Sequence, residues 1–139
     1  MKKYMDLAIK EAKKSLINED IPVGAIIIKN NIIISKAHNM KEVLCNATRH
    51  AEIIAIEKAC NKLNTWYLDD CILVTTMEPC MMCCGAIAQS RIKKIIYGVK
   101  NEKYGFSKFL SEKNKVECIK YEDDTEIINM LKNFFKERR

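Results

Sequence analysis

The first part of the chain carries two hydrophobic patterns, one typical of a helix and one typical of strands. Apolar residues recur every three or four positions at Met5, Ala8, Ile9, Ala12 and Leu16. This spacing predicts a helix over residues 2–18. Residues 23–29 and 32–37 are β-branched runs separated by Asn30-Asn31, a pair that tolerates left-handed backbone, so they predict a hairpin. Both runs are apolar almost throughout, and we therefore expect a sheet covered on both faces.

The pattern then alternates between helices and strands. Residues 39–48 are expected to form an irregular loop, with Thr48 as the N-cap of a helix over residues 49–62. Pro79 favours the first helical position and predicts the start of another helix. The further elements, in order, are a strand over residues 71–76, a short helix over 80–89, a strand over 94–99, a second short helix, a strand over 116–121 and a final helix over 125–138. This order predicts an α/β fold in which helices cover a five-stranded sheet, and it leaves the strand order open.

Length and composition are those of one globular domain. The chain has 139 residues, enough to bury a core without disulfides, so we expect a single domain over residues 1–139. No apolar run reaches the roughly 18 residues of a membrane span. Asp6, Lys10 and Glu11 interrupt the start, so no signal peptide is predicted and we expect a cytoplasmic protein.

The cysteines are distributed as in a metal site rather than a disulfide framework. There are seven of them, an odd number, and three lie within residues 80–84. A disulfide framework would favour an even number at dispersed positions in a secreted protein. We expect Cys60, Cys71 and Cys118, which fall in apolar segments, to be small core residues.

Two short motifs together supply the side chains of a metal site: His50-Ala51-Glu52 and Pro79-Cys80-Met81-Met82-Cys83. His50, Cys80 and Cys83 offer three zinc ligands, which leave the fourth tetrahedral position open for water, as in catalytic sites. We therefore expect one zinc ion per chain. His50 and Glu52 do not share a helical face, so both can serve one metal only beyond the N-terminus of their helix. The pattern predicts two helix N-termini directed at one zinc.

Glu52 is the acidic residue of these motifs and is not needed as a ligand. Zinc with two thiolates and one neutral imidazole has a net charge near zero, so it polarises water less than a site with three histidines. A nearby carboxylate compensates by taking a proton from the water, which can then attack a ring carbon that bears an amino group. Glu52 would pass the proton to a ring nitrogen and help ammonia leave. The combined pattern is the signature of zinc-dependent nucleobase deaminases.

The end of the chain is basic and aromatic. The formal net charge is +6, and the last residues combine cations with two adjacent phenylalanines: Lys132, Phe134, Phe135, Lys136, Arg138 and Arg139. Such a segment can contact a phosphate backbone and stack on bases. It is equally consistent with an amphipathic helix whose phenylalanines are core and whose charges are solvated. Adjacent helical residues point about 100° apart, so Phe134 and Phe135 cannot both be centred on the core-facing side.

A resemblance to a known family covers nearly the whole chain. The segments that carry it are Ile21-Pro22-Val23-Gly24-Ala25, Asn39, His50-Ala51-Glu52-Ile53, Met77-Glu78-Pro79-Cys80 through Cys83, Gly85-Ala86, Ser90-Arg91-Ile92, Tyr97-Gly98 and residues 134–139. On these segments the chain resembles the cytidine and deoxycytidylate deaminase superfamily. It is similar, more narrowly, to the bacterial tRNA-specific adenosine deaminases.

The resemblance implies a fold, an activity and a set of site residues. The fold implied is a three-layer αβα sandwich with a five-stranded mixed sheet. The activity implied is deamination of the wobble adenosine to inosine in a tRNA anticodon stem-loop, by a zinc enzyme that is usually a homodimer. His50, Cys80 and Cys83 match the zinc ligands and Glu52 the proton shuttle. Substrate contacts are implied for Val23, Asn39, Ala51, Phe135, Arg138 and Arg139.

Two other functions stay open on the sequence. The first is the same chemistry on a free nucleobase or nucleoside, of guanine or cytosine type, which would need an enclosed pocket rather than a basic, open rim. The second is an RNA-binding protein with a structural zinc, to which Cys84 could supply a fourth ligand; Glu52 would then have no task. A redox pair formed by Cys80 and Cys83 is disfavoured by the accompanying His50 and Glu52.

Three positions depart from the family pattern. Asn46-Ala47-Thr48 replaces the more usual Asp-Pro-Thr, and Arg49 stands where a small residue is usual before the histidine. Residues 103–109 are bulkier than the small, glycine-rich loop of the family. Arg49 and residues 103–109 lie where substrate selection could change, although drift of surface residues explains them as well. Asn39, in turn, is also typical of a turn residue that closes a strand.

Overall fold

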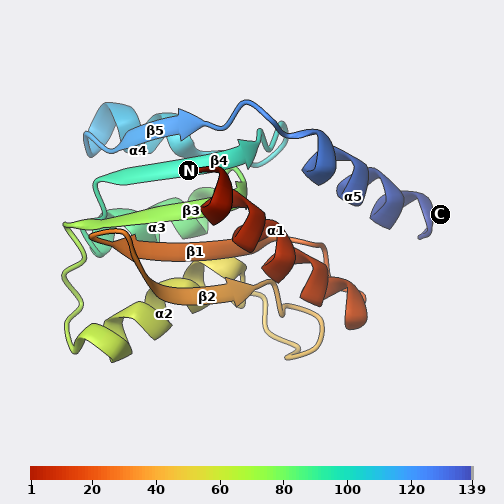
Figure 1. Ribbon diagram of the computed structural model, residues 1–139, viewed down its shortest axis with the longest axis horizontal. Coiled ribbons are helices and arrows are strands. Elements are labelled where there is room, and N and C mark those ends of the chain that lie inside the picture. The colour runs from red at the N-terminus through yellow and green to blue at the C-terminus, as the bar shows by residue number, and fades with distance from the viewer. Residues whose placement is uncertain (139) are drawn as a thin grey trace.

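The computed structural model describes residues 1–138 (Figure 1). These residues form five helices and one five-stranded sheet. In chain order the elements are α1 (Lys2–Ile17), β1 (Gly24–Lys29), β2 (Ile32–His38), α2 (Ala51–Leu63), β3 (Cys71–Met77), α3 (Met81–Gln89), β4 (Lys94–Val99), α4 (Ser107–Lys113), β5 (Glu117–Lys120) and α5 (Thr125–Lys136). This is the predicted order, with α4 as the short helix between the last two strands. Arg139 lies outside the described residues.

The sheet is mixed, with the strand order β2-β1-β3-β4-β5. Strand β1 is antiparallel to both β2 and β3, whereas β3 and β4, and then β4 and β5, are parallel. Parallel neighbours need a crossover connection, and α3 and α4 supply these two crossovers. The C-terminal ends of β3 and β4 therefore lie side by side at one end of the strands, next to the start of α3.

Helices cover both faces of the sheet, which confirms the three-layer αβα fold. In Figure 1, α1 lies in front of the sheet and α2, α3 and α4 behind it, while α5 extends to the right of the sheet. Residues of α5 join the hydrophobic cluster that α1 forms on its face of the sheet. Successive residues of a strand point to opposite faces. Accordingly, Ala25 and Ile27 of β1 belong to the core under α2 and α3, while Ile26 and Ile28 belong to the core under α1. The apolar residues of β1 thus contribute to the hydrophobic cores on both faces of the sheet.

Edge strand β2 is covered less completely than its apolar sequence predicted, and β5 at the other edge is also exposed. Ile32 at the start of β2 is 62% exposed, and none of the residues of β5 is buried. An edge strand has a neighbour on one side only, so its end residues reach beyond the helices. The hairpin itself is confirmed, because Asn30 and Asn31 have φ angles of 52° and 62°, as a two-residue turn between right-handed twisted strands requires.

Gly24, at the start of β1, sets the distance between α1 and the sheet. A Cβ atom at this position would collide with the carbonyl oxygen of Ala8 and lie 2.6 Å from the amide nitrogen of Ala12. Both are backbone atoms of α1, which cannot move aside without lifting the helix from the sheet. The glycine allows the helix backbone to approach the strand directly.

The starts of α2 and α3 differ from the prediction, and the difference matters for the site. Thr48 is not an N-cap: its hydroxyl donates to Asn46 Oδ1 over 2.8 Å, and the turn continues to residue 50. Helix α2 begins at Ala51 with His50 as its N-cap. Helix α3 begins at Met81 with Cys80 as its N-cap, so Pro79 precedes the cap instead of occupying the first helical position.

Candidate active site

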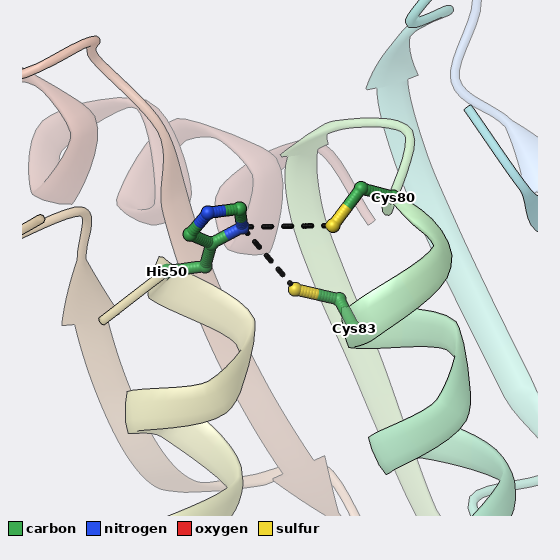
Figure 2. Close-up of side chains that lie close together, drawn as sticks. All are labelled: His50, Cys80 and Cys83. Atoms are coloured by element: carbon green, nitrogen blue, oxygen red, sulfur yellow. Dashed lines mark hydrogen bonds between the residues drawn. The ribbon is translucent and has the colours of Figure 1, made fainter. Parts of the chain in front are cut away.

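Three donor side chains meet where α2 and α3 begin. His50 caps α2, Cys80 caps α3, and Cys83 lies in the first turn of α3. His50 Nδ1 lies 3.6 Å from Cys80 Sγ and 3.6 Å from Cys83 Sγ (Figure 2). All three donor atoms fall within 4.8 Å of one another, a spacing suited to one metal ion. The two helix N-termini carry partial positive charge, which favours thiolate and other anions here.

The two thiols share one proton when no metal is bound. The pKa of Cys80 is lowered to about 3, chiefly because Cys83 donates a hydrogen bond to its thiolate. The pKa of Cys83 is raised for the same reason, since this thiol keeps the proton that makes the bond. The Cys80 thiolate also raises the pKa of His50 through a hydrogen bond. A metal that takes both sulfurs as thiolates must displace this proton.

Glu52 lies one helical position beyond Ala51, in the first turn of α2 and next to this group. Its side chain is almost fully buried, with 4% of the residue exposed. Burial raises the pKa of its carboxyl to about 7. A carboxyl with a pKa near the working pH can both accept and donate a proton in one reaction cycle.

His50 and Cys80 of the donor group line a cavity of about 510 Å³ together with Glu52. Four of its lining residues were expected from sequence as substrate contacts or as the proton shuttle: Val23, Asn39, Ala51 and Glu52. Others were missed as site residues: Ile21, Lys41, Met77, Glu78, Met81, Met82, Asn101 and Tyr104. Two signals pointed toward some of them, namely the Glu78-Pro79 pair of the second motif and the bulky stretch 103–109.

Asn39 acts as a turn residue and also lines the cavity. Its Nδ2 donates to the Ile21 carbonyl over 3.0 Å, and its Oδ1 accepts from the Lys41 amide over 3.1 Å. These bonds hold the loops on both sides of the cavity. A side-chain amide has two N–H groups and two lone pairs on oxygen, so Asn39 keeps one donor and one acceptor beyond these bonds. Asn39 can therefore be both a turn residue and a contact to the substrate.

Cys84 is not part of the donor group. It is fully buried, and its Sγ donates to the Pro79 carbonyl over 3.6 Å within the core behind the sheet. The fourth ligand that a structural zinc would need is therefore not supplied by Cys84. Cys71 is buried as well, as expected, whereas Cys60 and Cys118 are only partly buried.

The two adjacent phenylalanines of α5 have different surroundings. Phe134 is buried, and the Arg138 guanidinium stacks 3.8 Å from the centre of its ring. Phe135 is 51% exposed and lines a second cavity, with Lys100 and Lys132, away from the donor group. One phenylalanine thus anchors the helix, and the structure does not bring Phe135 into the candidate active site.

Arg138 lies nearer to the site than Phe135 does. It lines a surface cavity together with Asn39 and Lys41, residues that also line the cavity at the donor group. The same surface cavity contains the acidic Glu19 and Glu42, so its charge is mixed. Arg139 was expected to contact substrate too, and it falls outside the described residues.

Arg49 packs along α2 and does not line the cavity. Its two terminal nitrogens donate to the two carboxylate oxygens of Glu57 over 2.7 and 2.8 Å. Its carbonyl accepts from the Met40 amide over 3.0 Å. These bonds tie the loop before His50 to the helix after it, so Arg49 supports the position of the histidine.

The fold, and a His-Cys-Cys group beside a glutamate that is not a ligand, are typical of the zinc-dependent deaminases. The family model of the MafB19-like deaminases matches residues 1–139. A tRNA-specific adenosine deaminase of Aquifex aeolicus is 42% identical over 142 residues, which cover 98% of this chain and 94% of that protein. The chain belongs to the MafB19-like deaminase family, and it is a deaminase, an enzyme that removes an amino group by hydrolysis.

Solved structures agree with this assignment. A structure from studies of A-to-I editing by tRNA:A34 deaminases superposes with a TM-score of 0.88 at 29% identity, covering 94% of this chain and all (100%) of that one. A guanine deaminase of Bacillus subtilis gives a TM-score of 0.70 at 29% identity, covering 97% of this chain and 93% of that one. Among the described residues, none of the helices combines the length and apolar character needed to cross a bilayer.

Proposed function

We propose that this chain is a zinc-dependent deaminase that converts adenosine to inosine at the wobble position of a tRNA anticodon. The observation that carries the chemistry is a cavity lined by the buried carboxyl of Glu52 and by two members, His50 and Cys80, of the donor group that Cys83 completes. The substrate rests on the similarity to tRNA-specific adenosine deaminases, at 42% identity for the Aquifex aeolicus protein. Both parts are testable separately.

The donor group fits zinc. Two thiols and one imidazole are the soft and borderline ligands that zinc accepts, and they leave one tetrahedral position open. Zinc bonds of about 2.3 Å to sulfur and about 2.0 Å to nitrogen place the two donor atoms about 3.5 Å apart in a tetrahedral site. The distances from His50 Nδ1 to both sulfurs, 3.6 Å each, agree with this value. When bound, zinc acts as a Lewis acid that makes water nucleophilic near neutral pH.

Glu52 moves the protons of the proposed reaction. It accepts a proton from the water molecule that attacks C6 of the adenine ring, and it passes this proton to the ring nitrogen N1. It then transfers the remaining proton of the added hydroxyl group to the amino nitrogen, which leaves as ammonia and gives inosine. Burial raises the pKa of this carboxyl to about 7 in the metal-free protein, which favours a group that can both accept and donate a proton.

The cavity walls supply the proposed contacts to the base. The Ala51 amide belongs to the first turn of α2, where backbone N–H groups have no partner within the helix, so it can donate to a ring substituent. Asn39 has one donor and one acceptor left for the nucleoside. Val23 adds an apolar wall. Lys41, which lines this cavity, and Arg138, which lines the neighbouring surface cavity with it, would meet phosphates of a bound RNA.

Deamination of a free base is the second candidate, and the likeness to a guanine deaminase favours it. The deciding experiment compares an anticodon stem-loop with guanine, adenosine and cytidine as substrates, by quantifying ammonia and the product base. We expect inosine from the stem-loop and no turnover of the small substrates. Turnover of guanine with an inert stem-loop would replace the proposed function by the free-base activity.

Two further parts of the proposal concern assembly and location. We infer a homodimer from the resemblance to the tRNA-specific adenosine deaminases, and sedimentation velocity would test it. A species with the mass of a single 16.1-kDa chain at working concentrations would contradict the dimer. A tRNA substrate would also place the protein in the cytoplasm, which fractionation of cells that express a tagged chain would test.

A further inference from the structure

The segment between β4 and α4 is fastened to the residues that place Cys80. The Asn101 amide donates to Glu78 Oε1 over 3.2 Å, and the Ser107 hydroxyl donates to Glu78 Oε2 over 2.6 Å. Between them, the Phe106 amide donates to the Pro79 carbonyl over 2.9 Å, and Gly105 pairs with Cys80 as an isolated antiparallel bridge. Residues 101–107 thus form a turn fixed to the start of α3.

Gly105 is required for this close approach. A Cβ atom there would collide with the Glu78 carboxylate and lie 2.6 Å from the Asn101 carbonyl oxygen. The Gly105 amide donates to the same carbonyl over 2.8 Å, and the Tyr104 amide donates to Asn101 Oδ1 over 3.1 Å. The backbone of Tyr104 is therefore held firmly, within a turn that is hydrogen-bonded to Glu78 and Pro79 before α3.

The side chain of Tyr104, in contrast, projects outward. The residue lines the active-site cavity but is 63% exposed, whereas Glu52 in the same cavity is 4% exposed. Among the described residues that line this cavity, Tyr104 is the one tyrosine, phenylalanine or tryptophan. The Lys103 ammonium lies 5.4 Å from the centre of its ring. An exposed aromatic ring on a fixed backbone thus stands at the cavity, next to a cation.

We propose that Tyr104 stacks on a nucleotide adjacent to the target adenosine and helps to select RNA over free bases. This inference rests on the proposed function. The target base must reach Glu52 at the buried end of the cavity. The exposed Tyr104 ring at the rim therefore meets the nucleotides next to the target base in the RNA strand. Bases that flank a flipped-out nucleotide in a single-stranded loop stack readily on aromatic side chains. Lys103 supplies a positive charge for the neighbouring phosphate.

The test compares four proteins on one anticodon stem-loop: wild type, Tyr104→Ala, Tyr104→Phe and the control Tyr67→Ala. Tyr67 is also exposed, at 47%, but it precedes β3, whereas the cavity residues Met77 and Glu78 lie at the opposite end of that strand. Loss of one base–aromatic stack is expected to raise KM by about 5-fold or more in Tyr104→Ala, with kcat nearly unchanged. Tyr104→Phe should stay within about 2-fold of wild type, because stacking needs the ring and not the hydroxyl.

A direct readout of stacking accompanies the kinetics. The nucleotide on either side of the target is replaced, in separate stem-loops, by 2-aminopurine, whose fluorescence is quenched when it stacks. Wild type and Tyr67→Ala should quench one of the two probes, and Tyr104→Ala should quench it less. If wild type deaminates the stem-loop and Tyr104→Ala matches Tyr67→Ala in KM and quenching, the inference fails and the proposed function stands. A wild-type enzyme that is inactive on the stem-loop overturns the proposed function and this inference with it.

Discussion

Replacing Glu52 by Gln should make the metal-free protein more stable, and it should abolish most of the deaminase activity of the zinc-loaded protein. Burial raises the pKa of the Glu52 carboxyl from 4.5 to about 7, so the folded protein binds this proton more tightly than the unfolded chain does. Ionisation of Glu52 therefore removes stability as the pH rises from 4.5 to about 7. A tenfold change in proton affinity corresponds to about 1.4 kcal/mol, so the ionised carboxylate costs the fold about 3 kcal/mol above pH 7.

Glutamine has nearly the same shape as glutamate and does not ionise. The free energy of unfolding of Glu52→Gln, measured by urea titration after chelation, should exceed that of wild type by about 3 kcal/mol at about pH 8. The difference should nearly vanish at about pH 4, where both side chains are neutral. Activity of the zinc-loaded variant should fall by at least ~10²-fold, because the amide cannot carry a proton between water and ring nitrogen.

Two results would refute this reasoning. If Glu52→Gln and wild type differ in unfolding free energy by the same amount at both pH values, burial does not raise the pKa of the Glu52 carboxyl. Deamination near the wild-type rate would mean that another group moves the protons. Retained zinc in the variant is the control, since Glu52 is not among the three donor residues.

The remaining predictions concern the metal, the RNA and the core. Cys83→Ala should lose most of its zinc by atomic absorption, whereas Cys84→Ala should keep about one ion per chain; loss on changing Cys84 alone would reverse the assignment. Arg138→Ala should weaken stem-loop binding, and the slope of log K against log salt concentration should become shallower by about 0.7 because one phosphate contact is lost. An unaltered slope would mean that Arg138 is solvated and does not contact the RNA. Gly24→Ala should lower the unfolding free energy by about 1–3 kcal/mol or more, because its Cβ would collide with Ala8; a wild-type urea midpoint would contradict that close approach.

The local pattern of the sequence was enough to predict the elements and the donor group. Asn30-Asn31 predicted the hairpin turn because few residues other than glycine tolerate positive φ, and both have it. The two motifs predicted that His50, Cys80 and Cys83 converge, because these zinc ligands can serve one ion where two helix N-termini are directed at it. The 100° rotation between Phe134 and Phe135 predicted that one of them faces outward, and Phe135 is indeed exposed.

What could not be predicted depends on contacts between distant segments. The strand order follows from how the crossovers pack, which no local pattern records. The start of α2 was placed at Arg49 because Thr48 is a good capping residue, but Thr48 bonds to Asn46 and leaves the cap to His50. Tyr104 reaches the cavity only because Glu78 holds the turn that carries it, over a separation of more than twenty residues in the chain.

The use of His50 and Cys80 as N-caps has a consequence for the motions of the protein. Neither residue makes a side-chain hydrogen bond to its helix, although this position usually holds a serine, threonine or aspartate that does so. Each such bond is worth about 0.5–2 kcal/mol, so both helix starts are less secure than those of ordinary helices. Without a cation between them, the first turns of α2 and α3 should open often and exchange their amide protons quickly. A bound cation would join the two ends, so that one ion acts as the latch for two helices.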